Sequence, residues 1–184
     1  MDTPITILGI AGSLRKLSAN RGLLRAACLA APEGVTIEIF DLLGIPPYNQ
    51  DDETTSPAAV SQLKARIRAA DAILLATPEY NYSFSGVLKN ALDWASRPGG
   101  ESAWQGKPVA IMGASPGMLG TARAQYHLRQ CLVAFDMQAV NKPEVMIGLS
   151  AQRFDAEGNL TDEKSRQVVA KLVAALATLT RKLK

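Results

Sequence analysis

The feature that most constrains the fold of this 184-residue chain is a repeated alternation of short apolar runs with longer helical periods. Nearly continuous aliphatic runs at 5–10, 72–77 and 108–112 are typical of strands buried on both faces of a parallel sheet. The run at 35–40 predicts another strand, and 144–147 predicts a weaker fifth one. This alternation indicates an α/β fold, with a doubly wound five-stranded parallel sheet and helices on both faces.

Helical periodicity fills the stretches between these strands. Apolar residues recur at helical spacing in the stretches 23–31, 60–67, 87–95, 128–135 and 161–183. Proline and glycine end the first of these helices at 32–34 and the third at 98–100. Because the sequence shows no internal repeat and no linker, we expect residues 1–184 to form a single domain.

Composition narrows the classes of function. The chain carries 20 Lys and Arg against 17 Asp and Glu, a formal net charge of +3, and only 5% of its residues are aromatic. This mild basic excess can attract anionic small molecules, but it is not the charge pattern of a nucleic-acid-binding protein. A single histidine excludes a histidine-rich metal centre. We therefore expect no metal site and no nucleic-acid partner.

The sequence also bears on location and on its two cysteines. No stretch approaches the roughly 18 apolar residues of a membrane span, and residues 1–4 lack the basic segment of an export signal. We expect a cytoplasmic protein without a membrane span. Two cysteines make no disulfide framework; Cys28 and Cys131 lie on apolar helical stripes and are expected to be core thiols.

The first polar loop, residues 12–20, runs directly from a strand into a helix. It combines backbone N–H groups at a helix N-terminus with the hydroxyls of Ser13 and Ser18, the guanidinium of Arg15 and the amide of Asn20. Such a set suits a terminal phosphate. The glycine patterns of dinucleotide and nucleoside-triphosphate loops are absent, which favours a phosphomonoester. The alternative is an ordinary loop in which Ser18 or Asn20 caps the helix.

Two further polar loops follow the third and fourth predicted strands. Residues 77–83 carry Tyr80, Asn81 and Tyr82, which could present aromatic edges and backbone donors to a flat heterocycle; alternatively, the tyrosines close the rim of the core. Residues 113–117 add the hydroxyl of Ser115 and a glycine, Gly117, that permits close approach. Ligands of doubly wound sheets bind at the carboxyl ends of the strands, so the three loops can share one crevice.

Several segments, taken together, resemble a known family. They are Gly12–Arg15 with Ser18 and Asn20, Pro78–Ser83, Gly86–Trp94, Gly120, Arg123, Gln125–Gln130 and Asn141–Glu144. Over residues 5–150 this order is similar to that of the NAD(P)H-dependent FMN reductases, and within them to the bacterial chromate and quinone reductases. The resemblance implies a flavodoxin-like fold with strand order 2-1-3-4-5 and one FMN per subunit.

The resemblance also implies roles for individual residues. The FMN phosphate would be held by Ser13, Arg15, Ser18 and Asn20. The isoalloxazine would be lined, largely through backbone groups, by Pro78, Glu79, Tyr80 and Asn81, with Ser115 and Gly117 approaching from the other side. In the same branch, residues matching Arg123, Tyr126 and Glu144 join neighbouring dimers, which suggests a homodimer that assembles into a homotetramer.

One position departs from the family pattern. The family usually has proline before the glycine that begins the helix at 86–95, and this chain has Ser85. We expect the substitution to loosen the start of that helix, where the substrate opening lies.

Flavin chemistry explains why the sequence offers no nucleophile–base pair, since in a flavoenzyme the cofactor performs the difficult step. We hypothesise a ping-pong cycle in which NADH or NADPH delivers hydride to flavin N5 and a quinone, or chromate or an azo compound, is then reduced. One alternative is a flavodoxin-type electron carrier, which the charge of +3 disfavours because such carriers are usually acidic. Another is a reductase that releases reduced FMN to a partner monooxygenase.

Overall fold

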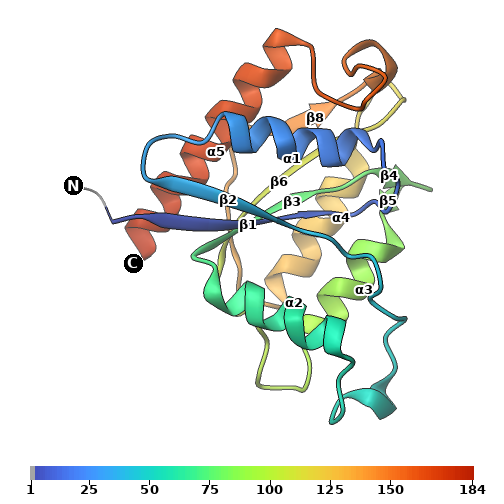
Figure 1. Cartoon of the computed structure of the whole chain (residues 1–184), viewed down its shortest axis with the longest axis vertical. Coiled ribbons are helices and arrows are strands. Elements are labelled where there is room, and N and C mark those ends of the chain that lie inside the picture. Colours follow the sequence, from blue (N-terminus) through green and yellow to red (C-terminus); the bar gives the residue numbers. More distant parts are fainter. Residues whose placement is uncertain (1–2) are drawn as a thin grey trace.

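The computed structural model describes residues 3–184, and its centre is one six-stranded sheet (Figure 1). All its pairings are parallel, and four strands form the central order β2-β1-β3-β6. Their bounds are β1 (Ile5–Ala11), β2 (Val35–Phe40), β3 (Ala72–Ala76) and β6 (Pro108–Ala114). The predicted α/β class and the flavodoxin-like order are confirmed.

The fifth position of the sheet differs in detail from the sequence prediction. Two short strands share the edge beside β6: β7 (Gln138–Ala139) pairs with its beginning and β8 (Val145–Ile147) with its end. Pro143 lies between them and has no N–H to donate to a ladder. The single strand predicted at 144–147 is therefore only the second half of an interrupted edge.

Helices cover both faces of the sheet, as predicted (Figure 1). One face carries α1 (Ala19–Leu29) and α5 (Glu163–Leu183), and the other carries α2 (Ala58–Ala69), α3 (Gly86–Ala95) and α4 (Ala122–Val133). Along β3, Leu74 packs into the core under α1 and α5, whereas Ile73 and Leu75 pack into the opposite one. This alternation is why the strand reads as a continuous apolar run. None of the helices in residues 3–184 is long and apolar enough to cross a membrane.

Side-chain caps fix where three of the helices begin. The hydroxyl of Ser18 accepts from the N–H of Asn20 at α1, and Asp162 accepts from the N–H of Ser165 at α5. At α3 the hydroxyl of Ser85 accepts from the N–H of Leu88 at 3.2 Å, and Ser85 is buried. The expected loosening at Ser85 is therefore wrong, because serine supplies a side-chain cap that proline cannot.

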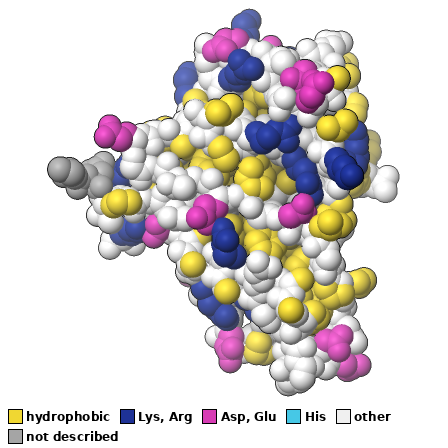
Figure 2. All heavy atoms as spheres, viewed as in Figure 1, with side chains coloured by type: hydrophobic (Ala, Val, Ile, Leu, Met, Phe, Trp, Pro, Cys, Tyr) yellow, Lys and Arg dark blue, Asp and Glu magenta, His cyan; other side chains and the backbone are white. Residues whose placement is uncertain are grey.

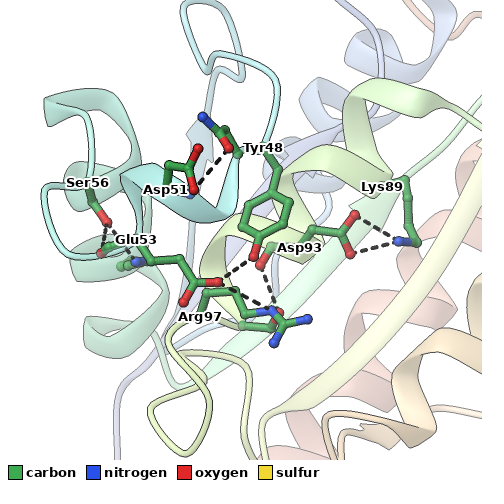
Figure 3. Close-up of polar contacts among 10 residues, drawn as sticks. Tyr48, Asp51, Glu53, Ser56, Lys89, Asp93 and Arg97 are labelled. Atoms are coloured by element: carbon green, nitrogen blue, oxygen red, sulfur yellow. Dashed lines mark hydrogen bonds and ion pairs between the residues drawn. The ribbon is translucent and has the colours of Figure 1, made fainter.

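The polar segment after β2, which includes the short 3₁₀ helix η1 (Gln50–Asp52), is fastened to α3. The backbone N–H of Tyr48 donates to Asn90 at 2.7 Å, and the ring of Tyr48 packs edge-on against Trp94. Figure 3 shows the Tyr48 hydroxyl directed at Glu53, with Arg97 beside the same carboxylate. The hydrogen bond to Glu53 raises the pKa of the Tyr48 phenol. These contacts involve the middle and the last turn of α3 rather than its first residues.

The two cysteines, expected in the core, are only half-buried at its margin, and Cys28 contacts the carbonyl of Ile37 at 3.6 Å. Burial raises the pKa of both Cys28 and Cys131. Because the thiolate is the reactive form, both should react with iodoacetamide at neutral pH more slowly than free cysteine. The rates should rise steeply only above the ordinary thiol pKa of about 8.5. Mass spectrometry of timed reactions would measure this, and alkylation at neutral pH as fast as that of glutathione would contradict it.

Candidate functional site

Three loops leave the carboxyl ends of β1, β3 and β6, and the structure brings them into direct contact. Gly12 donates its N–H to the carbonyl of Ala76 at 2.8 Å, which joins the end of β1 to the end of β3. A Cβ on Gly12 would lie 2.6 Å from the Ser85 hydroxyl, so only glycine permits this approach to the loop before α3. The predicted convergence of the loops is what the structure shows.

Glycine also permits the contact between the second and third loops. Gly113 is the second-to-last residue of β6. A Cβ on it would lie 2.4 Å from the carbonyl oxygen of Thr77 and 2.2 Å from the hydroxyl of Thr121. Thr77 and Thr121 are both fully buried. The end of β6 therefore touches the loop after β3 and the start of α4 at once.

Asn20 connects the first loop to the third. Its side-chain amide donates to the carbonyl of Ala114 at 3.0 Å and accepts from the N–H of Ala114 at 2.9 Å. Both residues are buried. This pair of bonds fixes the first turn of α1 against the end of β6, so Asn20 positions the first loop. The second hydrogen of its amide has no acceptor among the described residues.

The first loop has the donors expected of an anion site. Within residues 3–184, the consecutive backbone N–H groups of residues 13–17 donate to no protein acceptor. The hydroxyls of Ser13 and Ser18 lie at the two ends of this run and both residues are buried, whereas Arg15 is exposed. Ser18 also caps α1, so the two interpretations of its role are compatible. Free amides beside a helix N-terminus and a cation suit a phosphate.

The second loop is a β-hairpin built from β4 (Glu79–Tyr80) and β5 (Ser83–Phe84). Its two turn residues both have positive φ, +50° for Asn81 and +69° for Tyr82. That is the pattern of a type I′ turn, which favours glycine at its second position, so the tyrosine there is held against its preference. The rings of Tyr80 and Tyr82 are exposed rather than closing the core rim.

Glu79 does not extend into solvent from this hairpin. Its side chain is 5% exposed; one carboxylate oxygen pairs with the guanidinium of Arg123, and the other accepts from the N–H of Ala124 at 3.1 Å. The structure thus brings Arg123, predicted at an interface between dimers, together with a residue predicted at the flavin. Tyr126 and Glu144, the other two predicted interface residues, are exposed.

The third loop curls back on itself between β6 and α4. Ser115 donates its hydroxyl to the carbonyl of Gly120, and the carbonyl of Gly117 accepts from the N–H groups of Gly120 and Leu149. In the described chain the backbone N–H groups of residues 117–119 have no protein acceptor. Residues 117–119 therefore present a second set of free donors, in addition to those of the first loop.

The same three loops carry six exposed apolar side chains, which we call the apolar collar. Its members come from all three loops and are between 42% and 84% exposed: Leu14, Leu17, Tyr80, Tyr82, Met118 and Leu119. Figure 2 shows hydrophobic and basic side chains together along the right-hand edge, where Figure 1 places the hairpin and the start of α1. Exposed apolar groups gathered at one edge indicate a binding surface.

Two residues that hold the loops together were not predicted from the sequence. Arg21 donates through Nε to the carbonyl of Ser13 at 3.1 Å and through Nη2 to both oxygens of Asp41 at 2.7 Å, so it ties the first loop to the end of β2. Thr121 is the second, through its contact with Gly113. The sequence signal for Arg21 is its place in the first turn of the helix that follows the first loop.

Comparisons with known proteins identify the family of the chain. The family model described as NADPH-dependent FMN reductase matches residues 5–152. An NAD(P)H-dependent FMN reductase of Pseudomonas aeruginosa is 52% identical over 185 residues, covering 100% of both chains. An NAD(P)H:quinone oxidoreductase of Solanum tuberosum is 44% identical over 187 residues, covering 98% of this chain and 95% of the relative.

A solved structure extends the likeness to three dimensions. The flavoenzyme NAD(P)H:(acceptor) oxidoreductase FerB of Paracoccus denitrificans superposes with a TM-score of 0.88 at 38% identity, covering 97% of this chain and 98% of that one. The amide-lined loops, the strand order and these matches lead to one conclusion: the chain belongs to the NADPH-dependent FMN reductase family.

Proposed function

We propose that this chain passes electrons from NADH or NADPH, through FMN, to quinones. As a member of its family it is an oxidoreductase with FMN as cofactor and NAD(P)H as donor. The observation that carries the quinone assignment is the exposed apolar collar, because a flat, uncharged ring gains more from such a surface than an oxyanion does. The names of relatives from Burkholderia and Solanum tuberosum, a 2-hydroxy-1,4-benzoquinone reductase and a quinone oxidoreductase, support it.

The residues present fit FMN. The free amides of 13–17, two buried serine hydroxyls and one exposed arginine match the chemistry of a phosphomonoester. We therefore assign the phosphate to Ser13, Arg15, Ser18 and Asn20. We assign the ring to Pro78, Glu79, Tyr80 and Asn81 on one side and to Ser115 and Gly117 on the other.

Contacts of Asn20 and Glu79 bear on how these two residues would take part. Both ends of the Asn20 amide are bonded to Ala114, so Asn20 chiefly orients the loop and can offer the phosphate only its remaining N–H. The Glu79 carboxylate is engaged with α4, so Glu79 would meet the ring through its backbone. The resemblance to the family likewise implies backbone contacts at this segment.

The chain's own part in the reaction is binding and shielding. FMN, when bound, supplies the two-electron transfer between nicotinamide and acceptor. Tyr80 and Tyr82 present flat apolar surfaces against which a nicotinamide or a quinone ring can stack. Leu17 and Met118 add exposed apolar side chains from the neighbouring loops, which would shield a bound ring from water. A single open collar suits donor and acceptor binding in turn, which is the ping-pong order.

Spectroscopy of the purified protein tests the proposal. A bound-flavin absorbance that bleaches anaerobically with NADH or NADPH and recovers on adding a quinone supports the cycle. Chromate and an azo dye, added in parallel, rank the other acceptors. A flavin that binds without bleaching makes the chain an electron carrier, and a flavin lost during turnover makes it a supplier of reduced FMN. Either result contradicts the proposal.

Arg15 should contribute strongly to FMN affinity. It is the exposed cation of the phosphate-type loop, and a charge-assisted hydrogen bond accounts for about 1.5–3 kcal/mol, so Arg15→Ala should raise the dissociation constant of FMN about 10- to 100-fold. Lys16→Ala is the matched control, since it removes the neighbouring exposed charge and should cost less than about threefold. Quenching of FMN fluorescence by the apoprotein measures both; equal effects would mean that only net charge matters.

For assembly, we propose the homodimer that pairs into a homotetramer. Tyr126 and Glu144 remain exposed in the single chain and are therefore accessible to a neighbour. Arg123 is only partly exposed, and its guanidinium is already paired with the Glu79 carboxylate of the same chain.

A further inference from the structure

We propose that Arg123 is a positioning residue for the flavin, acting through Glu79 to hold the hairpin 79–84 in place. This rests on the proposed function only in that the hairpin lines the FMN ring. Arg123 sits in the first turn of α4 and pairs with the Glu79 carboxylate, with 2.5 Å between Nε and Oε1. The Glu79 side chain is 5% exposed, so this charge has little access to water. A carboxylate buried to that extent needs a partner.

The same carboxylate serves as the N-terminal cap of α4. Thr121, which precedes the helix, makes no side-chain cap, and the first turn contains no acidic residue. Glu79 supplies what is missing by accepting from the N–H of Ala124 at 3.1 Å. The positive end of the helix and the guanidinium therefore hold one carboxylate together, and the first residue of the hairpin is fixed to α4.

Arg123 contacts the other end of the hairpin as well. Its guanidinium lies 3.8 Å from the ring centroid of Tyr82, within the range of a cation–π interaction. Tyr82 is the turn residue with φ of +69°, where glycine is favoured. One turn further along α4, Nδ1 of His127 lies 3.2 Å from the hydroxyl of Ser83. A single arginine thus bridges the base and the turn of the hairpin, and stabilises a turn that the sequence disfavours.

The position of the hairpin bears on FMN because its backbone is assigned to the ring. If Arg123 is removed, the Glu79 carboxylate keeps its burial but loses its counter-charge. It can regain water only by moving, and the hairpin moves with it. The expected consequence is weaker FMN binding and a changed visible circular dichroism of the bound flavin, in a chain that remains folded.

A double-mutant cycle distinguishes this role from a purely intersubunit one. Arg123→Gln should raise the FMN dissociation constant about tenfold, while Glu79→Gln, which keeps an acceptor for Ala124, should cost about threefold or less. The double variant should bind FMN better than Arg123→Gln alone, because the unpaired charge is gone. Arg123→Lys should restore part of the affinity. Arg129→Gln, which loses a bond from the same helix to the carbonyl of Val140, is the control and should leave FMN affinity unchanged.

Sedimentation and thermal unfolding of each variant complete the test. Rescue by Glu79→Gln at unchanged oligomeric state supports the positioning role. Additive losses, or an Arg123→Gln effect that appears only when the assembly dissociates, would overturn it. If the unmodified protein binds no FMN, the proposed function fails instead, and the two failures are distinguishable.

Discussion

Replacing Gly113 with alanine should abolish FMN retention and destabilise the fold. The new Cβ would lie 2.2 Å from the Thr121 hydroxyl and 2.4 Å from the Thr77 carbonyl oxygen. Neither neighbour can yield, because both residues are fully buried and one contact is backbone. Overpacking typically costs about 1–3 kcal/mol, and contacts this short put Gly113→Ala at the upper end of that range. The end of β6 must separate from the loop after β3 or from α4, and either movement disrupts the contacts that hold the three loops together.

Gly86→Ala is the matched control. Gly86 begins α3, and a Cβ there would meet nothing within 4 Å. Alanine is the better helix former, so this variant should be neutral or slightly more stable. Urea denaturation and FMN titration of both variants measure the contrast. A Gly113→Ala protein within about 1 kcal/mol of the unmodified chain would show that the contacts at this position relax at little cost.

Asn20→Ala should lower the free energy of unfolding by about 2–4 kcal/mol, because two buried backbone groups of Ala114 lose their partners together. The loss should also weaken FMN binding, since the first turn of α1 is no longer fixed to β6. Chemical denaturation measures the first effect and fluorescence titration the second.

Two further substitutions make this result specific. Asn20→Asp keeps an acceptor for the Ala114 N–H but faces the Ala114 carbonyl with a second oxygen, so it should also destabilise. Ser18→Ala removes only the 3.2 Å cap bond to the N–H of Asn20 and should cost about 1 kcal/mol. An Asn20→Ala chain no less stable than Ser18→Ala would contradict the bridging role.

Much of the fold follows from local pattern. Strands such as β3 are apolar on both faces and alternate along the chain with long helical stripes, so their place in a parallel sheet is readable from sequence, whereas the strand order was implied by the family resemblance. The fifth position was predicted incompletely because β7 has only two residues and carries no pattern of its own. Its place depends on pairing with β6, including a 2.8 Å bond from Val140 to Val109.

The sequence predicts which loops form the candidate site, but not which residues of those loops contact one another. Polar residues that follow buried strands identify the loops. Asn20 and Ala114 are 94 positions apart, and Glu79 and Arg123 are 44 apart, so their pairing has no local signature. The resemblance suggested contacts between subunits for Arg123, whereas its contacts in the single chain depend on how α4 meets the hairpin. Only tertiary packing reveals which polar side chains face ligand and which support others.

The apolar collar has a consequence for how this enzyme can change over generations. Residues such as Leu17 and Met118, 56% and 84% exposed, bury little surface, so replacing them costs little stability. The groups that hold the loops together, such as Asn20 and Gly113, lie beneath them and are under a different constraint. If the collar binds the acceptor, as we propose, single substitutions in it can change which acceptors are reduced without passing through variants that fail to fold.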